Sequence, residues 1–215
     1  MSLLQSLSET PLGRALIAYF FDLPRWTLAN ILFALALLPA YLALTNGLLL
    51  AVAGATLPVV PVLAGMINIS ARQVAENAPR LRDAFAYPTT LYTVFLVWAG
   101  SAAAATLLFS GVPLIVVFLI GIVVFALLMI GVFAFFTPSQ LKVTSKLAWH
   151  NALVLGVSYP IIGLGLLMLA GIGIWAIWVS KGALILMIPA LWVIMAAFTV
   201  DERIAAFRSK QSSEG

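Results

Sequence analysis

The sequence has no cysteine, one histidine and very few charged residues. The lack of cysteine excludes disulfides, thiol catalysis and covalent haem attachment, and says nothing about the cellular compartment. Charged residues make up 8% of the chain and apolar residues 64%, whereas a soluble domain has about 25% and 45–50%. Because a water-soluble fold of this size could not cover its surface with so few charges, the composition predicts an integral membrane protein.

Four stretches without any charge set the number of predicted membrane crossings. They are residues 26–71, 84–141, 147–180 and 182–200. A spanning helix needs about 20 apolar residues, so these stretches fit two, two, one and one helices. We predict an all-α polytopic transmembrane bundle of six spans in three hairpins, as one domain over residues 1–205. The spans are 26–44, 48–69, 89–109, 113–136, 147–172 and 182–200.

Local signals predict how several segments begin and end. Thr10-Pro11 is typical of an N-cap with proline in the first helical turn, and it opens an amphipathic helix over 10–23 that Pro24 ends. We expect this helix to lie on the membrane surface; an ordinary cytoplasmic lead-in is the alternative. Pro138 is expected to close the fourth span, and Gly171 with Gly173 to break the fifth. Residues 206–215 are predicted to form a disordered polar tail, and no cleavable signal peptide is visible.

The distribution of basic residues predicts the orientation. With an even number of spans both termini share a side, and of the 11 Lys and Arg residues all except Lys181 fall on that side. The positive-inside rule then predicts a protein of the cytoplasmic membrane with both termini in the cytoplasm. The formal charge of +4 is explained by these loops, so the predicted surroundings are a lipid bilayer and not nucleic acid.

The predicted spans contain no Asp, Glu, Lys or Arg. Proton relays and membrane-embedded hydrolases need titratable groups at depth, and His150 alone cannot form a catalytic dyad or a metal site. We therefore predict a protein that is not an enzyme and has no cofactor and no metal. His150, beside Trp149 and Asn151, is either a pH-sensitive or ligand-binding group or an interfacial residue next to an aromatic anchor.

Five prolines fall inside the predicted spans and are expected to kink them, since each removes a backbone donor. They are Pro39, Pro58, Pro61, Pro160 and Pro189. If the chain consisted of two inverted halves of three spans, the interrupted spans 2 and 5 would occupy corresponding positions. Interrupted helices at corresponding positions are typical of a transporter's central site. Kinked helices in a compact bundle are the alternative. Polar residues on these spans either bind a polar ligand or satisfy freed carbonyls. They are Thr56, Asn68, Ser158 and Tyr159.

Four motifs resemble the YesL-like family, small bacterial integral membrane proteins of unknown biochemical activity. They are DLPRWTLANIL, LPVVPVLAGMINISAR, RLRDAFAYP and SKLAWHNALVLG. The matching positions are Asn30, Pro58, Pro61, Arg72, Lys146, Asn151, Ala152 and Leu153. The resemblance adds Asn30 to the candidate ligand-binding residues and implies an accessory role in carbohydrate uptake.

Two functions follow as hypotheses. The first is a non-enzymatic accessory or structural component of a membrane assembly, with protein partner subunits or as a homo-oligomer. The alternative is a small uncoupled transporter or channel for a neutral polar solute, built on the proline-broken spans 2 and 5.

Overall fold

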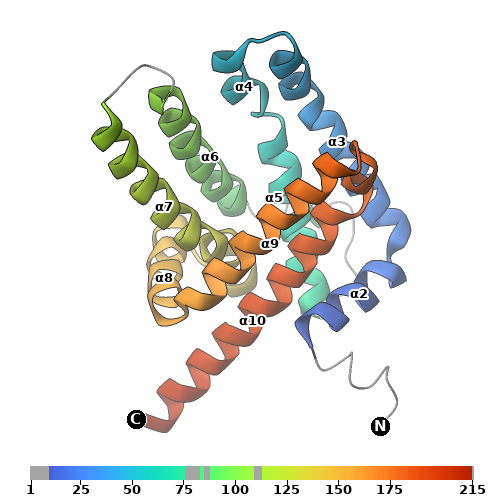
Figure 1. Cartoon of the computed structure of the whole chain (residues 1–215). Coiled ribbons are helices and arrows are strands. Elements are labelled where there is room, and N and C mark those ends of the chain that lie inside the picture. Colours follow the sequence, from blue (N-terminus) through green and yellow to red (C-terminus); the bar gives the residue numbers. More distant parts are fainter. Residues whose placement is uncertain (1–9, 76–82, 85–87, 109–112, 215) are drawn as a thin grey trace.

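The computed structural model of the protein describes residues 10–75, 83–84, 88–108 and 113–214 (Figure 1). Every regular element in this part of the chain is helical, which confirms the all-α prediction. The elements are α2 (Pro11–Phe21), α3 (Leu23–Thr45), α4 (Leu49–Ala55), α5 (Val59–Val74), α6 (Pro88–Leu108), α7 (Leu114–Leu141), α8 (Ser145–Ser158), α9 (Pro160–Val179), η2 (Ala183–Leu186) and α10 (Ile188–Glu214).

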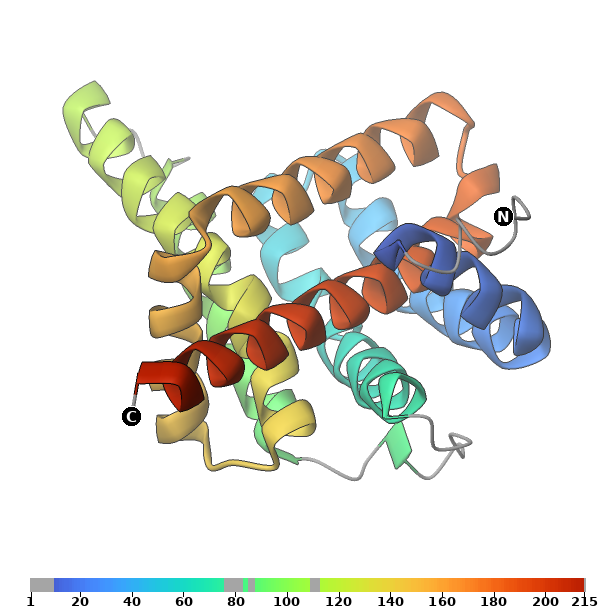
Figure 2. The same ribbon diagram turned by 90° about the horizontal axis from the view of Figure 1, so that it is seen from below.

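The core is organised around α10. Figures 1 and 2 show α10 running diagonally alongside α9, with α2 and α3 at one side and α7 and α8 at the other. Its buried face consists of small and β-branched residues, including Ala190, Val193, Ile194, Ala197 and Val200. Small side chains let helix backbones approach closely, and α10 contacts α2, α3, α5, α7 and α9.

Three of the described helices are long and apolar enough to cross a membrane. They are Leu23–Thr45, Ile115–Leu141 and Pro160–Val179. Their large apolar side chains are mostly exposed; Ile115 is 70% exposed, Ile161 80% and Trp178 78%. Apolar surface of this extent is unfavourable in water, which agrees with the prediction of a membrane protein. Shorter apolar helices cover Pro11–Phe21, Val59–Val74 and Thr89–Ala104.

The second predicted span consists of two helices, α4 and α5, separated at Thr56–Pro58. The break follows from Pro58, which has no N–H to offer to Gly54. The Gly54 carbonyl accepts from Leu57 N–H instead (3.1 Å), and Val59 N–H donates to the Thr56 carbonyl (3.0 Å). Pro61 lies in the first turn of α5, where a missing N–H breaks no intrahelical bond.

The expected break at Gly171 and Gly173 is wrong, because both residues lie inside the continuous helix α9. The chain breaks instead at Tyr159, which has φ −132° and ψ 56°, and Pro160 then starts α9. As a result α8 is a separate helix, and it packs beside the C-terminal part of α7 (Figure 1).

Three other proline expectations are corrected. The helix expected to stop at Pro24 ends already at Phe21, and Pro24 lies in the first turn of α3. Pro138 does not close α7, which continues to Leu141 and ends where Lys142 adopts φ 53°. Pro189 lies in the first turn of α10, where it interrupts no helix. Pro39 does lie inside a helix, as predicted.

The C-terminal segment is also different from the expectation of a disordered tail. Helix α10 continues through the charged residues Asp201, Glu202 and Arg203 to Glu214. The apolar part of this helix, 188–200, is therefore followed directly by a charged helical extension, which Figure 1 shows projecting away from the other helices.

Candidate functional site

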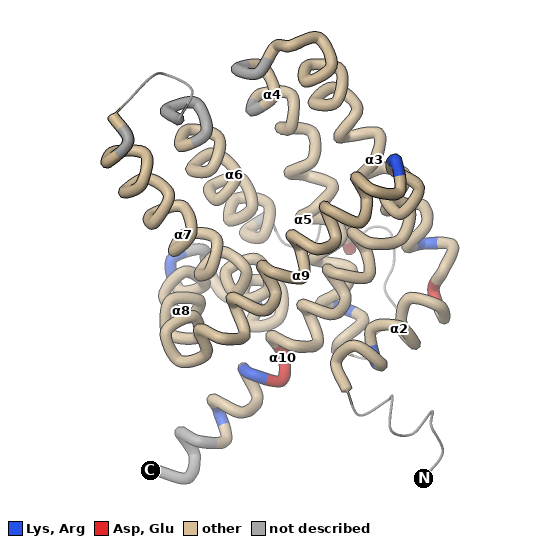
Figure 3. The backbone as a smooth tube through the Cα atoms, viewed as in Figure 1, with Lys and Arg blue, Asp and Glu red and all other residues tan. Residues whose placement is uncertain are grey.

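Charged and uncharged regions are separated in the structure. Figure 3 shows most blue and red segments in the lower half of the molecule, whereas the described upper parts of α3, α6 and α7 carry none. The turn between α9 and η2, which contains Lys181, is the blue segment away from this half. The separation matches the charge pattern that the sequence predicts for one side of a membrane.

Asn30 lies at a fully buried junction between α3 and the start of α10. Its Nδ2 donates to the Leu186 carbonyl (2.8 Å), and its Oδ1 accepts from Ala190 N–H (3.0 Å). Ala190 is in the first turn of α10, whose N–H groups have no intrahelical acceptors. Asn30 therefore caps α10 from another helix, 160 residues away in the sequence.

Tyr19 joins the same junction from α2. Its hydroxyl donates to the Leu186 carbonyl (3.3 Å), and the residue is 3% exposed. Burial raises the pKa of the Tyr19 hydroxyl above its ordinary value, so the group remains a hydrogen-bond donor at neutral pH. Side chains of the consecutive helices α2 and α3 thus meet at one carbonyl of η2, more than 150 residues further along the chain.

The two polar candidates of the second predicted span also contact neighbouring elements. At the α4–α5 break, Thr56 Oγ1 accepts from Trp98 Nε1 of α6 (2.9 Å). Asn68 is 1% exposed and its Nδ2 donates to the Ala84 carbonyl (2.9 Å). Among the described residues, Asn68 Oδ1 accepts no hydrogen bond.

The remaining candidates lie on α8 or at its end. His150 and Ser158 are exposed, and Asn151 is partly buried. Tyr159 lies at the break before α9, with the Arg203 guanidinium 5.8 Å from its ring centroid. The candidate residues therefore occupy three different parts of the fold: Asn30, the pair Thr56 and Asn68, and the group on α8. The contacts given above do not bring them to one shared site.

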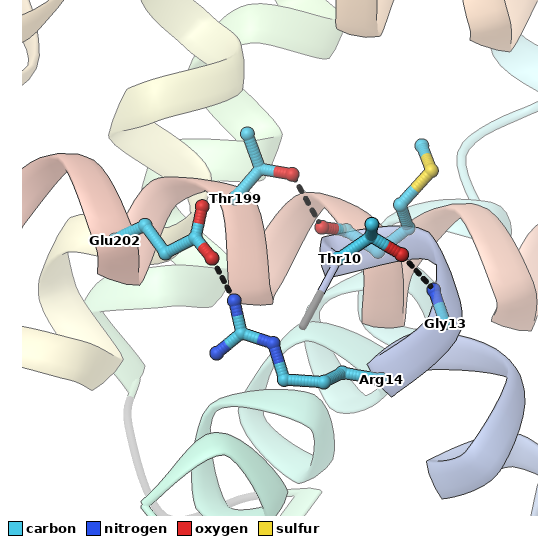
Figure 4. Close-up of polar contacts among 6 residues, drawn as sticks. Thr10, Gly13, Arg14, Thr199 and Glu202 are labelled. Carbon is cyan, nitrogen blue, oxygen red and sulfur yellow. Dashed lines mark hydrogen bonds and ion pairs between the residues drawn. The ribbon is translucent and has the colours of Figure 1, made fainter. Parts of the chain in front are cut away.

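Helix α2 is held to α10 by charged contacts that the sequence pattern did not predict. Arg14 forms an ion pair with Glu202 and its guanidinium lies 5.2 Å from the Phe198 ring centroid. Figure 4 shows this pair beside the N-cap of α2, where Gly13 N–H donates to Thr10 Oγ1 (3.0 Å). Nothing in the local pattern of either helix indicates this pairing.

Burial raises the pKa of the neighbouring Asp201 carboxyl, and the positive charges of Arg14 and Arg208 partly offset this effect. The carboxyl is outside the apolar part of α10. It is the second acidic group, after Glu202, close to Arg14 at this junction.

A buried polar layer lies where the C-terminal ends of α5 and α7 meet the N-terminal end of α6. Its members are Asn68, Ser70, Thr90, Thr93, Thr137 and Ser139. Most of the hydroxyls bond the carbonyl three or four residues earlier in their own helix, as Ser70 does with Ile67 (2.8 Å). The position of these residues next to the polar loops is the sequence signal that could have indicated this layer.

Several cavities lie between helices of the described chain. A cavity of about 560 Å³ lies between the α4–α5 break and α6, and its lining includes Pro58, Pro61 and Tyr92. One of about 240 Å³ separates α3 from α5 and is lined mainly by apolar side chains, with Arg25 among them. Another, of about 300 Å³, lies between α8 and the charged extension of α10. Within the described part of the chain, no group of three or more His, Asp or Glu residues is placed to hold a metal ion.

No protein-family model matches this chain, and neither a curated protein nor a solved structure does.

Proposed function

We propose that this protein is a non-enzymatic, multi-pass protein of the bacterial cytoplasmic membrane, acting as an accessory or structural subunit of a larger assembly. It crosses the membrane six times, through α3, α4 with α5, α6, α7, α9, and η2 with the first half of α10. Both termini are cytoplasmic. The segregation of charge to one half of the molecule supports this topology (Figure 3).

Two helices of the charged half lie along the cytoplasmic surface of the membrane in this proposal. Helix α2 buries Ala15 and Tyr19 but exposes Leu12, Phe20 and Phe21. Helix α8 exposes Leu147, Leu153 and Val157. Exposed apolar side chains on helices next to charged segments are typical of surface-lying amphipathic helices.

The observation that carries the structural role is that polar side chains of the predicted spans bond neighbouring elements. Asn30, Thr56 and Asn68 each bond another element through a side-chain atom. In an apolar medium such bonds hold helices together, because the alternative is an unsatisfied polar group. These side chains therefore serve packing between helices, which suits a rigid subunit that presents its outer surface to lipid and to partners.

Purification in mild detergent followed by native mass measurement tests this proposal. We expect the chain to be recovered with other membrane subunits or as a homo-oligomer. Liposomes that contain this chain alone should pass glycerol, erythritol and glucose no faster than protein-free liposomes. Recovery as a lone monomer, together with solute flux, would contradict the proposal.

A transporter for a neutral polar solute is the second candidate, and the helix breaks beside Pro58 and Pro160 favour it. Discontinuous helices expose backbone groups that can bind solutes. If this alternative holds, liposomes show flux with the natural chain, and Pro58→Ala or Tyr159→Phe abolishes it.

The link to carbohydrate uptake rests on the resemblance of the four sequence motifs to the YesL-like family. It predicts that affinity purification of the tagged chain from cells grown on oligosaccharides recovers sugar-importer subunits. Recovery of the same subunits with an unrelated tagged six-span protein would remove this support.

A further inference from the structure

The groove of about 300 Å³ beside α8 has two kinds of lining. Six apolar side chains form most of it: Leu141, Val143, Val154, Leu155, Ile204 and Phe207. Asn151 of α8 and Arg208 of α10 supply the polar part. A groove with an apolar floor and a cationic edge fits a molecule that has both an apolar and an anionic end.

The charge around the groove is positive. Arg208 is exposed and forms no ion pair or hydrogen bond among the described residues; its electrostatic influence reaches Asp201, which Arg14 also faces. Lys142 is exposed and lies between the lining residues Leu141 and Val143. No acidic side chain lines the groove, and Asp201, the carboxyl that Arg208 influences, lies outside its lining.

The position of the groove indicates which anion it meets. On the side of α8 turned away from the groove, Leu153 and Val157 are exposed, as expected of a helix at the membrane surface. The groove therefore opens at the depth of the lipid headgroups, where basic pockets between helices bind acidic lipids. This step rests on the proposed surface position of α8, and not on the number of crossings.

We propose that this groove is a binding site for the headgroup of an acidic phospholipid. Arg208 binds the phosphate, since the guanidinium fork matches phosphate oxygens, and the Asn151 amide supplies a further donor. The apolar floor takes the first part of an acyl chain. A soluble anion would gain nothing from that floor. A zwitterionic lipid such as phosphatidylcholine offers the same phosphate, but the cations around the groove repel its choline group.

Native mass spectrometry of the full chain, purified with added phosphatidylglycerol or phosphatidylcholine, tests the site. We expect phosphatidylglycerol to be retained more strongly, and Arg208→Gln to lower its retained fraction about tenfold, as for a lost bond to a charged group. Lys181→Gln is the matched control, because it removes the same charge from an exposed residue at the turn after α9. It should leave the fraction unchanged.

One further variant and one competition experiment separate the parts of the site. Val154→Trp fills the apolar floor and should lower phosphatidylglycerol retention while Arg208 is intact. Inorganic phosphate at millimolar concentration should not displace the lipid.

Equal loss with Arg208→Gln and Lys181→Gln, or equal retention of both lipids, would overturn the proposed site. Displacement by inorganic phosphate would show a site for soluble anions and overturn the lipid assignment. None of these results would affect the proposed topology, which recovery of the chain without detergent would overturn instead.

Discussion

Asn30 is the residue on which the packing of the first and last long helices depends most directly. Replacing it with alanine leaves the buried Ala190 N–H without an acceptor. The expected cost is about 1–3 kcal/mol of stability, measured as a lower midpoint of thermal unfolding in mild detergent. Asn46→Ala is the control, since Asn46 is exposed and bonds only the Leu42 carbonyl of its own helix (2.7 Å). Equal shifts for the two variants would show that the cap contributes nothing.

The acidic pair at the α2–α10 junction gives two predictions of opposite sign. Because burial raises the pKa of Asp201 above its ordinary 3.8, folding favours the protonated carboxyl. Its contribution to stability therefore falls as the pH rises from the unfolded-state pKa through the higher folded-state pKa. Asp201→Asn should raise the unfolding midpoint at about pH 7, and this gain should vanish below about pH 4.

Glu202→Gln should do the reverse at neutral pH. It removes the ion pair with Arg14, which for a half-exposed pair is worth about 0.2–1 kcal/mol. Midpoints of both variants followed over about pH 3–8 check the two signs. If Asp201→Asn lowers the midpoint at neutral pH, the burial of the charged carboxyl is not the dominant effect.

At the scale of the helices, two glycines of α9 differ in what surrounds them. A Cβ at Gly163 would lie 3.2 Å from Phe133 Cε2 and 3.4 Å from the Met129 carbonyl oxygen of α7, whereas at Gly165 it would meet nothing within 4 Å. Gly163→Val should therefore destabilise the protein by about 1–3 kcal/mol through forced separation of α7 and α9. Gly165→Val carries the same change in helix propensity and should stay within about 0.5 kcal/mol. Unfolding in mild detergent measures both, and similar losses would contradict the close α7–α9 packing.

The ends of several helices show what local sequence chemistry can predict. The N-cap at Thr10 and the turn at Asn46–Gly47, where Gly47 has φ +73°, follow from residue types alone. The break at Pro58 does too. The predicted break at Gly173 is wrong, because a glycine that allows Ile188 to approach closely gives the same sequence pattern as a glycine that turns the chain.

The candidate site was less predictable than the helices. Asn30 was singled out by resemblance, but its partners Leu186 and Ala190 are more than 150 residues away, and only the packing of α3 against α10 reveals them. The ion pair between Arg14 and Glu202 is likewise revealed only by the packing of α2 against α10. Periodicity describes one helix at a time, so contacts between helices lie beyond it.

At the scale of the whole molecule, the proposed topology has an even number of crossings and places the basic loops on the cytoplasmic side. The chain has no cysteine, so single cysteines can be introduced and labelled in intact cells with a membrane-impermeant maleimide. We expect Asn46→Cys and Lys181→Cys to be labelled from outside, and Ser209→Cys only after the cells are permeabilised. Labelling of Ser209→Cys in intact cells, or protection of both Asn46→Cys and Lys181→Cys, would contradict the proposed topology.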